Sequence, residues 1–144
     1  MKVKDSPIIV EQLFHNSVDE VWKAITELDQ MKEWFFDNIP DFKPEVGFRT
    51  QFNVNAPSRY FMHLWEVTKV MPNKMIVTNW RFEELEGNSL VIFELTSIGN
   101  KTKLTVTNKL TQDFDDSIPE FKRESCIGGW NYFIKERLVQ FLSS

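Results

Sequence analysis

Asn108, His63 and Cys126 are the side chains in this sequence best suited to hold or transform a small molecule. Asn108 falls on the same side of a predicted strand as Leu104 and Val106, because alternate residues of a strand face the same way. An amide that points into an apolar core needs a hydrogen-bond partner. Asn108 therefore either meets a partner inside the protein or faces a ligand.

His63 lies in a long apolar stretch, on the same strand face as Phe61 and Trp65. The neighbouring Met62 and Leu64 are equally apolar, so the sequence leaves open which face of this strand is buried. Inside a pocket, His63 would orient a polar ligand group or act as a base near neutral pH. On the opposite face it would meet solvent.

Cys126 is the single cysteine, so no intramolecular disulfide can form, and a reducing compartment, the cytoplasm, is expected. Nothing in the sequence predicts a lowered thiol pKa, so we interpret Cys126 as a packing residue. The sequence has no His-Glu-x-x-His motif, no paired cysteines and no glycine-rich phosphate loop. We therefore predict no metal, no cofactor and no catalytic residue.

The composition indicates one globular domain, residues 1–144, with many large rings. Its 13 Phe and 5 Trp can fill a wide core or line an apolar pocket. The net charge of −4 and the lack of a basic stripe argue against nucleic-acid binding. No membrane span and no secretory signal are predicted.

The first part of the chain predicts one strand followed by two short helices. The β-branched and aromatic residues at 8–14 indicate the strand. Ser17 opens a Ser-x-x-Glu capping box, which marks the start of the first helix. Asp29 is expected to cap the second helix, which carries Trp34 and Phe35 near its end.

Alternating apolar and polar residues then predict a run of antiparallel strands. The long strand 60–71 turns at Pro72-Asn73 into its partner, and Gly99-Asn100 predicts a two-residue hairpin. The apolar faces of these strands carry Phe48, Phe52, Phe93, Leu95, Leu104 and Val106.

The last segment, 117–142, predicts a long amphipathic helix. Ser117 is its expected N-cap, with Pro119 in the first turn. Its apolar side consists of Ile127, Trp130, Ile134, Leu138 and Phe141. Each glycine of Gly128-Gly129 costs about 1 kcal/mol in a helix, so the pair predicts a close backbone approach or a bend. Strands flanked by helices indicate an α+β fold in which this helix covers the apolar face of the sheet.

These elements resemble the START-like, or helix-grip (SRPBCC), superfamily, and within it bacterial proteins similar to the C-terminal domain of the activator of Hsp90 ATPase. The likeness rests on 14–22 (FHNSVDEVW), 43–52 (KPEVGFRTQF), 65–80 (WEVTKVMPNKMIVTNW) and Gly129-Trp130 with the helix that follows. The resemblance implies a curved antiparallel sheet of six to seven strands wrapped around the C-terminal helix, with two short helices after the first strand. It also implies an elongated apolar cavity between sheet and helix.

We therefore expect a domain that binds a small hydrophobic molecule, lipid-like or aromatic, and favour this over an enzymatic role. The alternatives are an interaction domain with a chaperone partner, which the resemblance suggests, and a cyclase- or hydrolase-type enzyme, which needs inward acid–base residues. The candidate ligand-binding residues are Trp34, Phe35, Phe48, Phe52, His63, Phe93, Leu95, Leu104, Val106, Asn108, Trp130 and Ile134.

Overall fold

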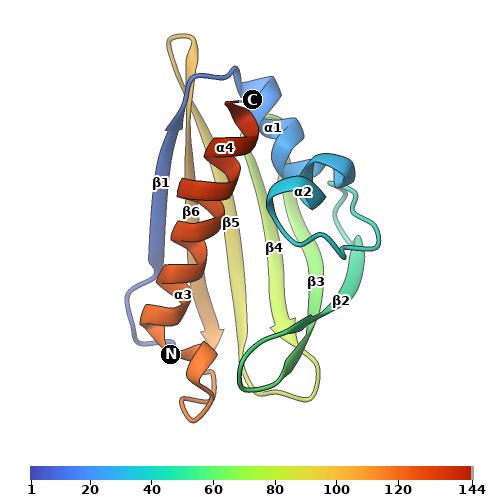
Figure 1. Ribbon diagram of the computed structural model, residues 1–144, viewed down its shortest axis with the longest axis vertical. Helices are drawn as coiled ribbons and strands as arrows, with labels where there is room; N and C mark the ends of the chain where they lie inside the picture. Colours follow the sequence, from blue (N-terminus) through green and yellow to red (C-terminus); the bar gives the residue numbers. More distant parts are fainter. Residues whose placement is uncertain (144) are drawn as a thin grey trace.

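In a computed structural model of the protein, which describes residues 1–143, an antiparallel sheet curves around a long C-terminal helix (Figure 1). The strands are β1 (Ile8–Phe14), β2 (Arg49–Asn55), β3 (Tyr60–Met71), β4 (Met75–Phe82), β5 (Asn88–Ile98) and β6 (Lys101–Gln112). Their order across the sheet is β1-β6-β5-β4-β3-β2, so the first and last strands are neighbours. The predicted α+β, helix-grip architecture is confirmed.

Two short helices, α1 (Val18–Thr26) and α2 (Leu28–Trp34), connect β1 to β2. The predicted capping box is present: the backbone N–H of Glu20 donates to Ser17 Oγ at 3.2 Å, and the Glu20 carboxylate accepts from the Ser17 backbone N–H at 3.4 Å. The prediction that Asp29 caps α2 is wrong, because the helix already begins at Leu28 and Glu27 takes the N-cap position.

The C-terminal helix begins later than predicted and changes its winding. It comprises a 3-10 turn, η1 (Pro119–Phe121), then α3 (Arg123–Trp130), a π-helical stretch, η2 (Asn131–Arg137), and α4 (Leu138–Leu142). Ser117 is not its N-cap: Ile118 takes the N-cap position of η1, and Lys122 takes that of α3. The Ser117 hydroxyl instead donates to the Asp115 carboxylate at 2.7 Å. Among residues 1–143, no helix has the length and apolarity needed to cross a bilayer.

The inner face of the sheet packs against this helix. On the strands whose inward face the sequence left open, the buried residues include Ile8 and Val10 of β1, Phe61, His63 and Trp65 of β3, and Ile76 of β4. The helix buries Trp130, Ile134 and Leu138 of its predicted apolar side in the same core. Figure 1 shows the far end of the helix, α4, beside α1.

Gly128 and Gly129 do not mark a close backbone approach. A Cβ atom added to either glycine would meet no atom within 4 Å, apart from the helix's own nearby backbone. The predicted tight contact is therefore wrong, because the space beside both glycines is open. The change to π-helical winding follows directly, at Asn131.

Candidate functional site

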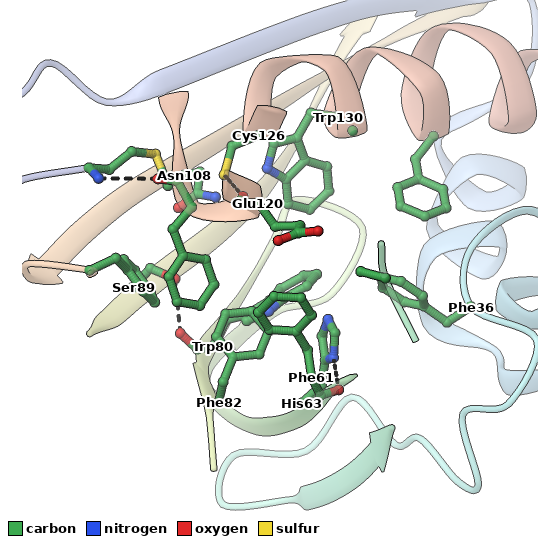
Figure 2. Close-up of a pocket in the computed structure, with 16 residues that line it drawn as sticks. Phe36, Phe61, His63, Trp80, Phe82, Ser89, Asn108, Glu120, Cys126 and Trp130 are labelled. Carbon is green, nitrogen blue, oxygen red and sulfur yellow. Dashed lines mark hydrogen bonds between the residues drawn. The ribbon is translucent and has the colours of Figure 1, made fainter. Parts of the chain in front are cut away.

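An apolar pocket lies between the inner face of the sheet and the first half of the C-terminal helix (Figure 2). Its volume is about 190 Å³. A dry apolar cavity of roughly 150 Å³ is large enough to take up benzene, whereas pockets for drug-sized ligands start at about 300 Å³. The pocket therefore suits a compact molecule.

Aromatic rings form most of the pocket wall. The sheet contributes Phe61 of β3 with Trp80 and Phe82 of β4, and the helix contributes Trp130 and Phe133. The rings of Trp80 and Trp130 approach to 5.6 Å between centroids, so sheet and helix touch directly here. Rings of this kind offer broad apolar surface that is already ordered before a ligand arrives.

His63 reaches the pocket from β3 and is only 5% exposed. Its ring stacks on Phe52 at 4.9 Å, and its Nδ1 lies 3.0 Å from the carbonyl oxygen of Phe61. Because a carbonyl only accepts, Nδ1 carries the proton in the neutral ring and Nε2 is left as an acceptor. Burial lowers the pKa of His63 to about 4, so the imidazole is neutral at pH 7 and is a poor base there.

Asn108 lines the same pocket from β6, on the inward face that the strand alternation predicted. Its Oδ1 atom is buried and accepts no hydrogen bond from the described residues. An unpaired buried acceptor costs about 1–3 kcal/mol. Of the two roles left open by the sequence, the structure thus favours the one in which Asn108 faces a ligand.

Glu120, which sequence reasoning missed, brings a carboxylate to the pocket from η1. It accepts hydrogen bonds from the hydroxyl and the backbone N–H of Ser58, the latter at 3.2 Å. The bond from the Ser58 hydroxyl is the largest cause of a lowered pKa, so the Glu120 carboxylate is ionised at neutral pH. Glu120 therefore places a negative charge at the pocket wall.

Cys126, on α3, also borders the pocket (Figure 2). Burial raises the pKa of its thiol to about 11, and its Sγ donates weakly to the backbone carbonyl of Glu120 at 3.6 Å. The group is a thiol rather than a thiolate at neutral pH. The structure supports the interpretation of Cys126 as a packing residue.

Of the candidate ligand-binding residues, His63, Asn108 and Trp130 come together at this pocket. The remainder lie outside its lining: Trp34, Phe35, Phe48, Phe52, Phe93, Leu95, Leu104, Val106 and Ile134. Phe35 and Phe93 border a smaller space of about 20 Å³. Phe48 is half-buried against Phe42, and the other residues of this group fill the core.

Trp34 and Phe35 do not form a lip of the pocket. Trp34 is fully buried, its indole N–H donates to the carbonyl of Ala24 at 2.7 Å, and its ring stacks on Phe35 at 4.6 Å. The next residue, Phe36, lines the pocket instead. Phe61 was also missed, although it shares a strand face with His63, so placing His63 inward would have placed Phe61 with it.

The described residues contain no cluster of three or more His, Cys, Asp or Glu side chains arranged to hold a metal ion. The polar residues of the pocket are outnumbered by apolar ones, most of them aromatic. Such a wall suits binding and orienting an apolar molecule.

Solved structures share this fold. DynU16, a protein of the dynemicin biosynthetic locus, is 24% identical with a TM-score of 0.79; the alignment covers 97% of this chain and 48% of DynU16, about half its length. MLL2253 from Mesorhizobium loti is 28% identical with a TM-score of 0.71, covering 96% of this chain and 97% of MLL2253. The Aha1 dimer from Colwellia psychrerythraea is 21% identical with a TM-score of 0.73, covering 96% of each chain.

No curated protein matches the sequence. A family model does: the one described as activator of Hsp90 ATPase homolog 1-like protein matches residues 15–143, which is nearly the whole chain. This match agrees with the helix-grip fold of the structural neighbours and with the START-like superfamily that the sequence motifs resemble. The chain belongs to the activator of Hsp90 ATPase homolog 1-like family.

Proposed function

We propose that this protein binds a small hydrophobic molecule in the pocket between the sheet and the C-terminal helix. The observation that carries the proposal is the open volume of about 190 Å³ behind a wall of aromatic rings. Protein interiors are close-packed and rarely keep voids larger than a water molecule. A space of this size, lined by a residue with an unpaired buried acceptor, is therefore the natural site for a ligand.

The size of the pocket favours a compact aromatic molecule over a long-chain lipid. Burial of apolar ligand surface contributes about 25 cal/mol per Å², and a flat ring system can lie against the rings of Trp80 and Trp130, which both line the pocket. These two rings already pack in the apo protein, so binding orders few additional side chains.

Gly129 and Gly128 provide a matched pair of variants for the test. Gly129 lines the pocket, whereas the exposed Gly128 does not. Gly129→Leu should fill the pocket and abolish binding of a probe such as naphthalene, followed by fluorescence or calorimetry. Gly128→Leu should bind like the wild type, because its side chain lies outside the pocket. Wild-type protein that binds no small aromatic probe, and co-purifies with no ligand in native mass spectrometry, would contradict the proposal.

The family match supports a second candidate, an interaction domain for an Hsp90-type chaperone. A purified chaperone of this type should then co-elute with the protein in size-exclusion chromatography. The protein should also change the ATPase rate of the chaperone. Absence of both effects at micromolar concentrations would remove this candidate. Because Gly129→Leu closes the pocket without altering the outer surface, it separates the two functions. A cytoplasmic location remains a prediction.

A cyclase- or hydrolase-type enzyme has less support. His63 and Asn108 do border one pocket, as such an enzyme would need. The pKa of about 4 makes His63 a weak base at neutral pH, and Cys126 is protonated. Replacing either His63 or Asn108 should therefore alter ligand affinity rather than remove a turnover.

A further inference from the structure

We infer that the pocket is selective for neutral or cationic ligands that donate a hydrogen bond, anchored at Asn108 Oδ1, and discriminates against carboxylates of the same shape. This inference rests on the proposed binding function and specifies its ligand class. It follows from which polar atoms of the wall remain free to bond and from the sign of the charge beside them.

Asn108 Oδ1 is the strongest anchor. The atom is buried and unpartnered among the described residues, and the side chain lines the pocket. Oδ1 itself is closed off from the open space, so a ligand O–H or N–H reaches it once the amide turns about χ2, and then supplies the missing bond. A methyl group or an ether oxygen leaves the acceptor unpaired. Because the rest of the wall is mostly aromatic, few other groups can offset an acceptor that is left unpaired.

Other polar side chains of the wall already donate their protons to the backbone. The Ser89 hydroxyl donates to the carbonyl of Trp80 at 2.9 Å, and His63 Nδ1 donates to that of Phe61 at 3.0 Å. Ser89 Oγ and His63 Nε2 can therefore only accept a further hydrogen bond. Ser89 Oγ, on the strand next to Asn108, reinforces a preference for ligands that donate.

The charge on the wall is negative. The Glu120 carboxylate stands on the helix side of the pocket, across from Trp80 and His63 (Figure 2). No lysine or arginine belongs to the described lining. The ammonium of Met1 donates hydrogen bonds to the Asp116 carboxylate at 2.6 Å and to the carbonyl of Phe121 at 3.1 Å.

A ligand carboxylate would therefore meet a like charge, and the one cation among the described lining residues, the Met1 ammonium, is already paired with Asp116. The lining residues Trp80, Trp130 and Asn108 also carry N–H donors. These groups are neutral, so they do not replace a cation opposite Glu120. A neutral ligand avoids this repulsion, and a cationic ligand gains attraction.

Asn108 and His63 cannot both hold one compact ligand. They lie on β6 and β3, three strands apart in the sheet order, which corresponds to about 14 Å at the usual spacing between strands. The ligand is thus anchored at one end of the pocket. We assign that end to Asn108 because its acceptor is the buried one that lacks a partner.

Two pairs of ligands with nearly identical shapes test this selectivity by calorimetry at pH 7. In the first pair, 2-naphthol should bind about tenfold tighter than 2-methylnaphthalene, although the methyl group is more hydrophobic than the hydroxyl. In the second pair, 2-naphthamide should bind at least tenfold tighter than 2-naphthoate. Equal or reversed affinities within either pair would overturn the corresponding part of the inference.

Variants assign each preference to its residue. Asn108→Leu should remove the preference for 2-naphthol and leave the affinity for 2-methylnaphthalene equal or higher. Glu120→Gln should reduce the ratio of the affinity for 2-naphthamide to the affinity for 2-naphthoate. Unchanged ratios in these variants, with cooperative melting that shows each variant to be folded, would refute the assignments. If all four probes bind wild type equally, the selectivity fails and the binding function stands; if none binds, both fail.

Discussion

Ser58 and Glu120 join two segments that lie 62 residues apart in the sequence, the loop after β2 and the turn before α3. The Ser58 backbone N–H lies 3.2 Å from Glu120 Oε2, and the Ser58 hydroxyl donates to Oε1. Ala56 of the same loop and Glu120 itself both line the pocket. The contact therefore holds the pocket edge together and fixes the position of the negative charge.

The Ser58–Glu120 contact should stabilise the protein at neutral pH and lose this effect in acid. Its hydrogen bonds lower the Glu120 pKa below the ordinary value of 4.5. A lowered carboxyl pKa gives stability that is complete above the unfolded pKa and declines as the pH falls through the folded pKa. In urea unfolding, wild type should have a higher free energy of unfolding than Glu120→Gln at pH 7. This difference should shrink as the pH falls below 4.5. A difference that does not shrink as the pH falls below 4.5 would contradict this.

His63 should make the protein sensitive to milder acid. Burial lowers its folded pKa from 6.5 to about 4, so the unfolded chain binds a proton that the folded one does not. The contribution of the neutral His63 to the free energy of unfolding is therefore fully present above pH 6.5. The free energy of unfolding should fall by roughly 3 kcal/mol as the pH drops to 4. His63→Phe, which keeps an aromatic ring at this position, should flatten the curve in this range.

His15 provides the control for that measurement, because it is the other histidine and is exposed. His15→Gln should keep the wild-type pH dependence in urea unfolding between pH 4 and pH 6.5. If the dependence disappears in His15→Gln and remains in His63→Phe, the buried histidine is not its source.

The predicted strands and the first helix cap agree with the structure because their signals are local. The alternation around Asn108 identifies its face from neighbours two residues away, and Ser17 bonds within the first turn of its own helix. Ser117 is not a cap because the helical segments begin later, after Ile118 and Lys122, and its hydroxyl donates to Asp115 two residues back.

The position of the pocket could not be predicted in this way. Leu104, Val106 and Asn108 follow one alternation on β6, yet the first two are buried in packed core and the third borders the open space. Whether an inward residue meets another side chain or a void depends on elements that are far apart in sequence. Glu120 shows the same limit, because its place at the wall depends on η1.

Replacing either glycine of the helix pair by alanine should stabilise the protein. A Cβ atom at Gly128 or Gly129 meets open space, and alanine is favoured over glycine inside a helix by about 1 kcal/mol. Urea unfolding should therefore show an increase of up to this size for each single variant. A decrease at either position would mean that the backbone is tighter there than the described geometry indicates.

Replacing Asn108 by an apolar residue should stabilise the ligand-free protein. Its buried Oδ1 lacks a partner, so Asn108→Leu removes an unsatisfied acceptor and should raise the free energy of unfolding by about 1 kcal/mol. Thr102, on the same strand and fully buried, provides the contrast because its hydroxyl donates to the carbonyl of Asn16 at 2.8 Å.

Thr102→Val breaks that satisfied bond and leaves a carbonyl unpaired, so it should lower stability by about 1 kcal/mol. Opposite signs for these two variants in urea unfolding would show that Asn108 is kept at a cost to the apo protein. A clear loss of stability in Asn108→Leu would mean instead that the amide has a structural partner. In that case the selectivity for donating ligands would lose its anchor.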